Sequence, residues 1–391
     1  MRERAGIVVV GAGVQGASLA FHLARRGADV LVVERGTIAS GATGRSSGFV
    51  RMHYDLESEA ALAHRSFPYF TAWDEHVGAG DPGFVRTGFL QLVAPALAPA
   101  LRANVETHRR IGIDSRVVGP DEVAALVPGI AVDGIVAAAY EPSSGYADPS
   151  GTAAGFLAAA RRHGARVVQG RVVERILVAG ERVAGVATDA GPIDAPVVVA
   201  VAGAWSAELA ATAGVEIPVR PWRHHTAYFG LPAARPAGDI PIVLDDPNGV
   251  YFRPEGRELL LVGLEGANEV GGSPDRPLEG PGSAIVGRMV DAVCTRLPWM
   301  AAGDLRTAHG GQDGITPDQR AILGAAGPDG LYLACGFSGT GFKTAPAIGA
   351  AMAELILDGA SATADLDDFR PARFAEGRPL VGSYGHLWRD D

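Results

Sequence analysis

The chain has 391 residues, 47% of them hydrophobic, with 53 glycines and a formal net charge of −10. This length exceeds one ordinary compact core, so we expect two domains of a densely packed α/β protein. The negative charge argues against nucleic acid or an anionic membrane surface as a partner, and no apolar run approaches the length of a membrane-spanning helix.

The first predicted elements are a strand, a glycine turn, a helix and a second strand. Residues 7–10 read Ile-Val-Val-Val, the continuous apolar run of a strand that is buried on both faces of a parallel sheet. The apolar face of the next segment has helical spacing and ends at Gly27, and residues 30–33 form the second strand. The chain is therefore expected to begin with a strand–helix–strand unit.

The turn before the helix carries the pattern G-x-G-x-x-G at Gly11, Gly13 and Gly16. The first glycine permits the tight turn, the second lets backbone approach a pyrophosphate, and the third lets the helix pack on the strand. Glu34 lies 18 residues after Gly16, near the spacing at which a carboxylate accepts hydrogen bonds from ribose hydroxyls. An ordinary glycine-rich turn is the alternative, but these elements together favour a dinucleotide, and the acid disfavours NADP.

Further strand-like segments with turn residues between them occur at residues 87–95, 223–231 and 249–265. The last of these predicts a hairpin with residues 254–256 at its turn. A loop of small residues at 41–48 suits a bulky isoalloxazine ring lying close to the chain.

Five segments besides the N-terminal turn are similar to one known family. They are ERGTIASGATGRSSGFVR (34–51), YADPSGTAAGFLAAARRHGARV (146–167), VVVAVAGAWS (197–206), TPDQRAILG (316–324) and GFSGTGFK (336–343). Together they resemble the FAD-dependent amine and amino-acid oxidoreductases, which include sarcosine oxidase, dimethylglycine dehydrogenase, glycine oxidase and D-amino-acid oxidase. The resemblance covers nearly the whole chain.

This resemblance implies an α/β fold in which a Rossmann-type FAD-binding domain is interleaved with a mostly antiparallel-sheet substrate domain. Residues 1–85, 145–220 and 310–391 would build the FAD-binding domain. Residues 86–144 and 221–309 would build the substrate-binding domain over the flavin.

The resemblance also implies which residues bind FAD. They are Gly11, Gly13, Val14, Gly16, Glu34, Arg35, Thr43, Arg45, Ser46, Ser47, Val173, Gly203, Trp205, Gly311, Gly339, Thr340, Gly341, Phe342 and Lys343. Monomeric sarcosine oxidases attach FAD through a cysteine at or beside the position of Gly311. Dimethylglycine dehydrogenases use a histidine in the loop that here contains Thr43 and Arg45. Because neither attachment residue is present, we expect FAD to be bound noncovalently.

The segment CGFSGTGFK at residues 335–343 places three glycines before a lone lysine. In the family this segment meets the flavin, and we expect the backbone N–H groups of residues 339–342 to donate to the pyrimidine edge. Negative charge develops there when the flavin is reduced, so donors stabilise the reduced form. Lys343 would hold a substrate carboxylate. The alternative is a solvated lysine at a helix end.

Seven residues are candidates for contact with the reacting groups: Arg51, Tyr54, Tyr251, Lys343, His225, Glu265 and Asp313. Arg51 matches an arginine near the flavin ring in relatives, with a structural salt bridge as the alternative. Tyr54 follows in a segment where monomeric sarcosine oxidases place a second arginine for the substrate carboxylate. That arginine is absent here, which leaves Lys343 to bind a carboxylate.

The remaining candidates come from the predicted substrate domain and its border. Tyr251 is on a strand expected to line the pocket, with core packing as the alternative. His224 and His225 point to opposite faces of one strand, and we favour His225 for the pocket. Glu265 and Asp313 in the pocket would favour a cationic substrate, although either could face outward. No cluster of His, Cys or acidic residues has the spacing of metal ligands, so no metal site is expected.

The leading hypothesis is an FAD enzyme that oxidises a C–N bond of a secondary amine or amino acid, similar to sarcosine, to an imine by hydride transfer to flavin N5. The acceptor stays open between O₂ and another carrier, because Leu261 replaces a lysine that promotes reaction with O₂ in sarcosine oxidases. Alternatives are a flavoprotein subunit similar to the β chain of heterotetrameric sarcosine oxidases and a tailoring oxidase acting on a larger amine.

The expected partners are a small amine substrate, the electron acceptor and either partner subunits or further copies of the chain. Cys294 and Cys335 are the only cysteines. Nothing marks a secreted disulfide framework, so we expect reduced thiols and a cytoplasmic protein.

Overall fold

A mainly parallel sheet of six strands forms one part of the molecule. The computed structural model describes residues 3–233, 235, 240–266 and 268–385. The strand order is β10-β3-β2-β14-β22-β21, and β21 alone runs antiparallel to its neighbour. The strands are β2 (Ile7–Val10), β3 (Val30–Val33), β10 (Arg166–Val168), β14 (Val197–Ala200), β21 (Ile322–Ala325) and β22 (Leu331–Cys335). All residues of β2 and β3 are buried, which confirms the predicted pair of central strands.

Different layers cover the two faces of this sheet. Val9 and Val32 pack among helices, whereas Val8 and Leu31, next to them in the same strands, pack against a second sheet. The helices of the first layer are α1 (Val14–Arg25), α2 (Glu57–Thr71), α3 (Trp73–His76), α6 (Pro149–Arg162) and α9 (Gly341–Asp358). The opposite layer consists of β1 (Glu3–Arg4), β11 (Val173–Ala179), β12 (Arg182–Thr188), β13 (Gly191–Asp194) and helix α7 (Ser206–Ala211).

A nine-stranded sheet forms the other part of the molecule. Its neighbouring strands are antiparallel except for β6 and β16. The strands are β6 (Phe89–Leu92), β7 (Arg116–Val118), β8 (Ala138–Glu141), β15 (Arg220–Gly230), β16 (Ile242–Asp245), β17 (Val250–Glu255), β18 (Leu259–Leu264), β19 (Glu269–Val270) and β20 (Asp304–Ile315). Helices α4 (Ala98–Arg110), α5 (Pro120–Leu126) and α8 (Ser283–Arg296) accompany it.

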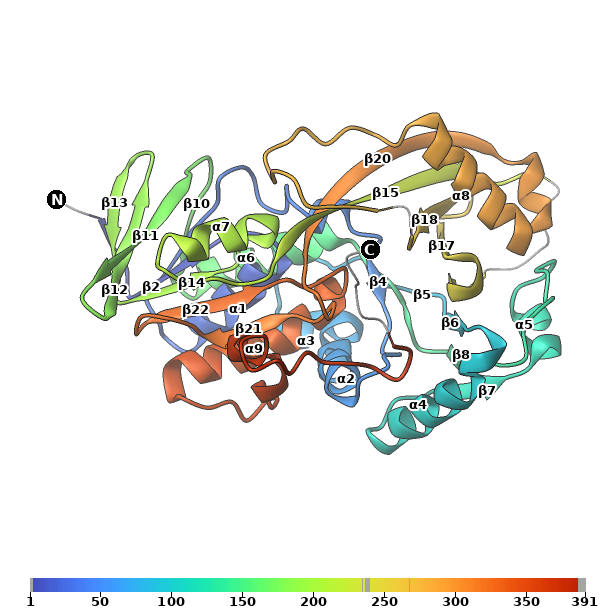
Figure 1. The fold of residues 1–391 in the computed structure, drawn as a ribbon, viewed down its shortest axis with the longest axis horizontal. Coiled ribbons are helices and arrows are strands. Elements are labelled where there is room, and N and C mark those ends of the chain that lie inside the picture. The colour runs from blue at the N-terminus through green and yellow to red at the C-terminus, as the bar shows by residue number, and fades with distance from the viewer. Residues whose placement is uncertain (1–2, 234, 236–239, 267, 386–391) are drawn as a thin grey trace.

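The two large sheets lie at opposite ends of the view in Figure 1, and the long strands β15 and β20 extend between them. A small sheet of β4 (Phe49–Val50), β5 (Val85–Arg86) and β9 (Gly145–Tyr146) lies between the ends. The predicted α/β class, with a Rossmann-type part interleaved with a mostly antiparallel sheet, is confirmed. Strand β20 crosses the predicted boundary at residue 310, and the exact division of the chain into domains stays a prediction.

Local signals in the sequence set several of these boundaries. Asp148 caps α6, since its carboxylate accepts from the N–H of Ser150 at 2.9 Å, and Pro149 occupies the first helical position. The hairpin of β17 and β18 is present, but its turn begins at Gly256, with φ of +57°, because Pro254 still belongs to β17. Among the described residues, no helix combines the length and the apolar character needed to cross a bilayer.

Candidate active site

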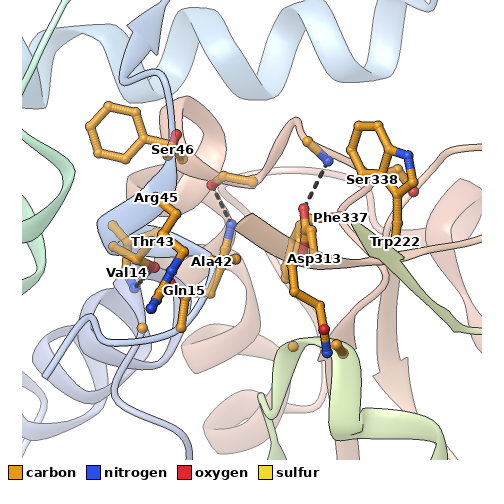
Figure 2. Close-up of a pocket in the computed structure, with 18 of the residues that line it drawn as sticks. Val14, Gln15, Ala42, Thr43, Arg45, Ser46, Trp222, Asp313, Phe337 and Ser338 are labelled. Atoms are coloured by element: carbon orange, nitrogen blue, oxygen red, sulfur yellow. Dashed lines mark hydrogen bonds between the residues drawn. The ribbon is translucent and has the colours of Figure 1, made fainter. Parts of the chain in front are cut away.

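A cavity of about 940 Å³ lies where the two parts of the molecule meet. This volume is at the upper end of the range of ligand sites, about 300–1,000 Å³. The glycine turn after β2 and the segment 337–343 before and within α9 both line it, although they are more than 300 residues apart in the chain. Figure 2 shows side chains from both ends of the chain around this cavity. The predicted juxtaposition of the two glycine segments is therefore present.

The glycine turn places backbone where a side chain would not fit. Gly11 has φ of +114°, and a Cβ there would lie 2.4 Å from the carbonyl oxygen of Val201. Gly11 and Gly13 line the cavity, and Gly13 is the N-cap of α1. Gly16 does not line it, because its Cβ position, 2.1 Å from the Gly11 carbonyl oxygen, faces the turn itself. Gly16 thus acts through helix packing rather than through ligand contact.

Glu34 joins the glycine turn to the loop after β3. One carboxylate oxygen accepts from the N–H of Ala12 and the other from the N–H of Gly36, both at 2.8 Å. The N–H of Val14, in the first turn of α1, donates to the hydroxyl of Thr43 at 3.0 Å. Since a carboxylate oxygen can accept more than one hydrogen bond, Glu34 remains able to receive ribose hydroxyls.

The rest of the expected cofactor residues fall into two groups along the cavity. Arg45 donates to the carbonyl oxygen of Ser40, and with Thr43, Ser46 and Ser47 it lines one stretch. Val173, Gly203, Arg35 and Trp205 line another.

Asp275 was not found by sequence reasoning, although it fixes part of the second stretch. It accepts from the indole N–H of Trp205 and from the Arg35 guanidinium, both at 2.9 Å. The guanidinium carbon also lies 4.6 Å from the Trp205 ring centroid. These hydrogen bonds lower the pKa of Asp275. Asp275 is in a loop 240 residues from Arg35, so no local pattern could have indicated it.

The segment before α9 differs from the expectation in its hydrogen bonding. The N–H of Gly339 donates to Asp313 at 2.9 Å, and the N–H of Thr340 donates to the carbonyl oxygen of Phe337 at 2.9 Å. Two of the four backbone donors expected to face the cofactor are therefore used within the protein. Gly341 and Phe342 begin α9, where N–H groups have no carbonyl partner within the helix.

Gln15 ties the two ends of the chain together. Its side-chain amide donates to the carbonyl oxygen of Gly341 at 2.7 Å, across 326 residues of sequence (Figure 2). Gln15 is the second of the two residues between Gly13 and Gly16, positions at which the glycine pattern allows any residue. Only the packing of α9 beside α1 makes this residue part of the site.

Lys343 is buried, so the alternative of a solvated lysine is excluded. It is 6% exposed, and its Nζ lies 3.5 Å from the Gly339 carbonyl oxygen and 5.8 Å from the Tyr54 ring centroid. Burial, followed by the charge of Arg51, lowers the pKa of Lys343 well below its ordinary value. An anionic ligand group beside it would favour the charged ammonium.

Arg51, Tyr54 and Tyr251 line the cavity, and their contact with the reacting groups stays a prediction. Arg51 donates to the carbonyl oxygen of His53, and its guanidinium carbon lies 4.5 Å from the Tyr54 ring centroid. Burial is the main cause that raises the pKa of both tyrosines. A Cβ at Gly263 would fall within the Tyr251 ring, so this glycine on the neighbouring strand makes room for the tyrosine.

Two acids of the cavity repel each other through their negative charges, and sequence reasoning found one of them. Glu265 and Asp246 both line the cavity, and burial, followed for Glu265 by the negative charge of Asp246, raises their pKa values. Glu265 is exposed where it lines the cavity, yet protein surrounds the carboxyl group closely enough for burial to dominate. Arg51 acts in the opposite direction on both acids, which indicates that its charge lies near them.

Asp313 also lines the cavity but is differently engaged. Its two oxygens accept from the N–H groups of Gly314 and Gly339, so it supports the glycine segment. Nearby, Arg320 of the TPDQR motif forms buried ion pairs with Asp55 at 2.6 Å and with Glu59 at 3.2 Å. Asp55 and Arg320 line the cavity as well.

Two residues that were expected in the site, His225 and Gly311, do not line the cavity. His225 does not line the cavity, and His224 does, so the preference for His225 is wrong. Gly311 does not line it either. It lies opposite His224 in the β15–β20 pairing, and a Cβ there would be 2.4 Å from the imidazole. This glycine makes room for His224, whose pKa burial lowers to about 4.

Comparison with known proteins identifies a family for this arrangement. Residues 6–355 match the family described as FAD dependent oxidoreductase. The chain is 29% identical to human mitochondrial sarcosine dehydrogenase over 91% of its length, but it spans only 40% of that protein. It is 26% identical to the sarcosine oxidase subunit beta of Rhodobacter capsulatus, with 96% of the chain and 90% of the relative covered.

Among solved structures, the fold is similar to L-proline dehydrogenase from P. horikoshii. The TM-score is 0.89 at 28% identity, and the alignment covers 97% of this chain and all of the other.

Proposed function

Because the chain belongs to the family of FAD dependent oxidoreductases, we propose that it oxidises the C–N bond of a secondary amine or amino acid to an imine. The names of the compared proteins support this proposal: sarcosine and L-proline are both secondary amines that carry a carboxylate. The chain spans less than half of sarcosine dehydrogenase, so the similarity does not imply that this chain has the complete activity of that protein.

The residues of the cavity fit FAD. Gly11 leaves no space for a Cβ, the N-terminus of α1 favours phosphate, and Glu34 offers carboxylate oxygens to a ribose. FAD, when bound, supplies the acceptor for the hydride that leaves the substrate carbon. The chain's own residues must then position the substrate, exclude water and handle its charges.

The observation that carries the proposal is that one cavity is lined by groups of opposite charge. Lys343 and Arg51 offer cationic groups to a carboxylate, and Asp246 and Glu265 offer acceptors to an ammonium group. Amine oxidation by hydride transfer requires the neutral amine. We propose that the Asp246–Glu265 pair, once ionised, takes the ammonium proton at a carboxylate oxygen and leaves the amine neutral.

Anaerobic bleaching of the flavin tests this function. Sarcosine, N-methyl amino acids, L-proline and amines without a carboxylate should be compared, and at least one secondary amine should reduce the flavin. Glu265→Gln should slow reduction by a cationic amine at least tenfold, and Glu106→Gln, at an exposed position of α4, should not. Reduction by hydroxy acids alone, with no response to amines, would contradict the proposal.

A second candidate is a flavoprotein subunit of a larger assembly. The similarity to a sarcosine oxidase subunit beta over 96% of this chain favours it. Gel filtration of the purified chain distinguishes the two, since turnover by a stable monomer or homo-oligomer argues against obligatory partner subunits. We further propose that the electron acceptor is O₂ or another carrier and that the protein is cytoplasmic, in keeping with its two free cysteines.

A further inference from the structure

Three buried polar side chains from distant parts of the sequence meet at the wall of the cavity, which His53 lines and which His108 and Glu141 do not. They are His53 in the segment after β4, His108 in α4 and Glu141 at the end of β8. Their exposures are 1%, 1% and 0%. One potential ligand atom from each lies within 4.8 Å of the others. The intervals between residues 53, 108 and 141 match no metal-ligand spacing, and for this reason the sequence analysis did not predict this group.

Each of the three side chains is held from its far side by another hydrogen bond. Nε2 of His108 lies 2.8 Å from the carbonyl oxygen of Tyr54. Because a carbonyl oxygen only accepts, Nε2 must carry the proton, and Nδ1 of His108 is left with a free lone pair. Nε2 of His53 lies 2.8 Å from the hydroxyl of Tyr384.

Glu141 is oriented in the same way. Its Oε2 accepts from the N–H of Met52 at 2.9 Å and from the hydroxyl of Ser144 at 2.7 Å. These two hydrogen bonds fix the orientation of the carboxyl group, and with it the position of the other oxygen, Oε1.

The atoms that remain have no hydrogen-bond partner within the described part of the chain. They are Nδ1 of His53, Nδ1 of His108 and Oε1 of Glu141, all buried. A buried polar atom without a partner costs about 1–3 kcal/mol, so three in one place require an explanation. A single water could donate to only two of three acceptors. In the tautomer in which Nε2 of His53 donates to the Tyr384 hydroxyl, all three atoms carry a lone pair, and a cation can satisfy all three.

We propose that His53, His108 and Glu141 bind a divalent transition-metal ion, with zinc as the best match, through Nδ1, Nδ1 and Oε1. Two imidazoles and one carboxylate are ligands that zinc accepts at about 2.0–2.2 Å. Hydrogen bonds from the far ring nitrogen to a carbonyl or hydroxyl oxygen are the usual support for such histidines. Binding would draw the three atoms closer than their present separation.

The electrostatics of the group are compatible with a cation. Burial lowers the pKa of both histidines, which keeps their lone pairs available. Burial raises the pKa of Glu141 to about 7, and the positive charge of Arg51 acts in the opposite direction. A cation held at Oε1 would favour the ionised carboxylate, because a metal ligand must be deprotonated. The ion would tie α4 and β8 to the segment that carries Arg51 and Tyr54. It would thus hold in place the part of the cavity wall that contains Arg51, His53 and Tyr54.

The test uses the full flavin-loaded chain, stripped of metal with a chelator and titrated with ZnCl₂ against a chromophoric competitor. We expect one zinc per chain and a higher thermal unfolding temperature with zinc than without it. His108→Gln and Glu141→Gln should each weaken binding at least tenfold. Ser144→Ala should weaken it less, because it changes only a supporting hydrogen bond. His64→Gln, at a half-buried histidine of α2 outside the group, should leave it unchanged.

X-ray absorption at the zinc edge keeps the proposal testable if a variant fails to fold. Two imidazole nitrogens and carboxylate oxygen around zinc in the wild-type protein would support it. Absence of stoichiometric binding by the wild-type chain, sulfur ligation, or undiminished binding by folded His108→Gln would overturn it. Amine oxidation is measured separately, so failure here leaves the proposed function untouched.

Discussion

Gly16→Ala tests whether the glycine turn acts through packing. The Cβ of alanine would lie 2.1 Å from the Gly11 carbonyl oxygen, and real Cβ contacts essentially never fall below 3.0 Å. Helix α1 must therefore move off the turn by about 0.9 Å. FAD binding requires the N–H groups of α1 and the turn in their original relation, so the cost of overpacking, about 1–3 kcal/mol, should appear in the affinity. That range corresponds to a dissociation constant raised about 5- to 150-fold.

The assay is titration of the FAD-free protein with FAD, followed by quenching of flavin fluorescence. Gly287→Ala, in the interior of α8, is the matched control, because a Cβ there meets no atom within 4 Å. It should leave FAD affinity unchanged and stabilise the protein by about 0.5–1 kcal/mol. A wild-type dissociation constant for Gly16→Ala would refute the reasoning, since Gly16 does not line the cavity and has no other route to the ligand.

Three further predictions concern the cavity and its surroundings. Lys343→Met should raise KM about 10- to 100-fold for amines that carry a carboxylate, because a hydrogen bond to a charged group contributes about 1.5–3 kcal/mol. For amines without a carboxylate, KM should change less than threefold. Equal increases in KM for the two kinds of amine in steady-state assays would show that Lys343 does not recognise the carboxylate. Burial raises the pKa of Glu59 to about 7, so the folded state binds this proton more tightly than the unfolded chain, and the stability contributed is lost as pH rises from about 4.5 to 7. The free energy of unfolding, measured with urea, should therefore fall between pH 5 and pH 8, and it should fall by up to about 3 kcal/mol less in Glu59→Gln than in the wild type. Equal falls in the two proteins would contradict the raised pKa of Glu59. Neither Cys294 nor Cys335 lines the cavity, so acid precipitation should release yellow flavin into the supernatant, and colour kept in the pellet would show a covalent bond.

The sequence determined the features that depend on neighbours along the chain. The glycine turn and the acid after β3 follow from local backbone geometry, and both are present as predicted. The similarity of GFSGTGFK to a family segment also placed the second glycine segment at the cavity. Such signals are readable because the physical requirement and the residues that meet it are adjacent.

Tertiary structure decided which faces and which distant partners meet. Alternation in β15 required His224 and His225 to point apart, but only the pairing of β15 with β20 shows that His224 faces the cavity. Asp246 became the partner of Glu265 because a turn after β16 lies beside the end of β18.

The same holds for the group of His53, His108 and Glu141, whose members lie on three separate elements. The spacing of residues in the sequence predicts contacts only within one helix or strand, because the repeats of 3.6 and 2 residues relate residues of the same element. Contacts between elements depend on how the sheets and helices pack, and that arrangement is a property of the whole folded chain.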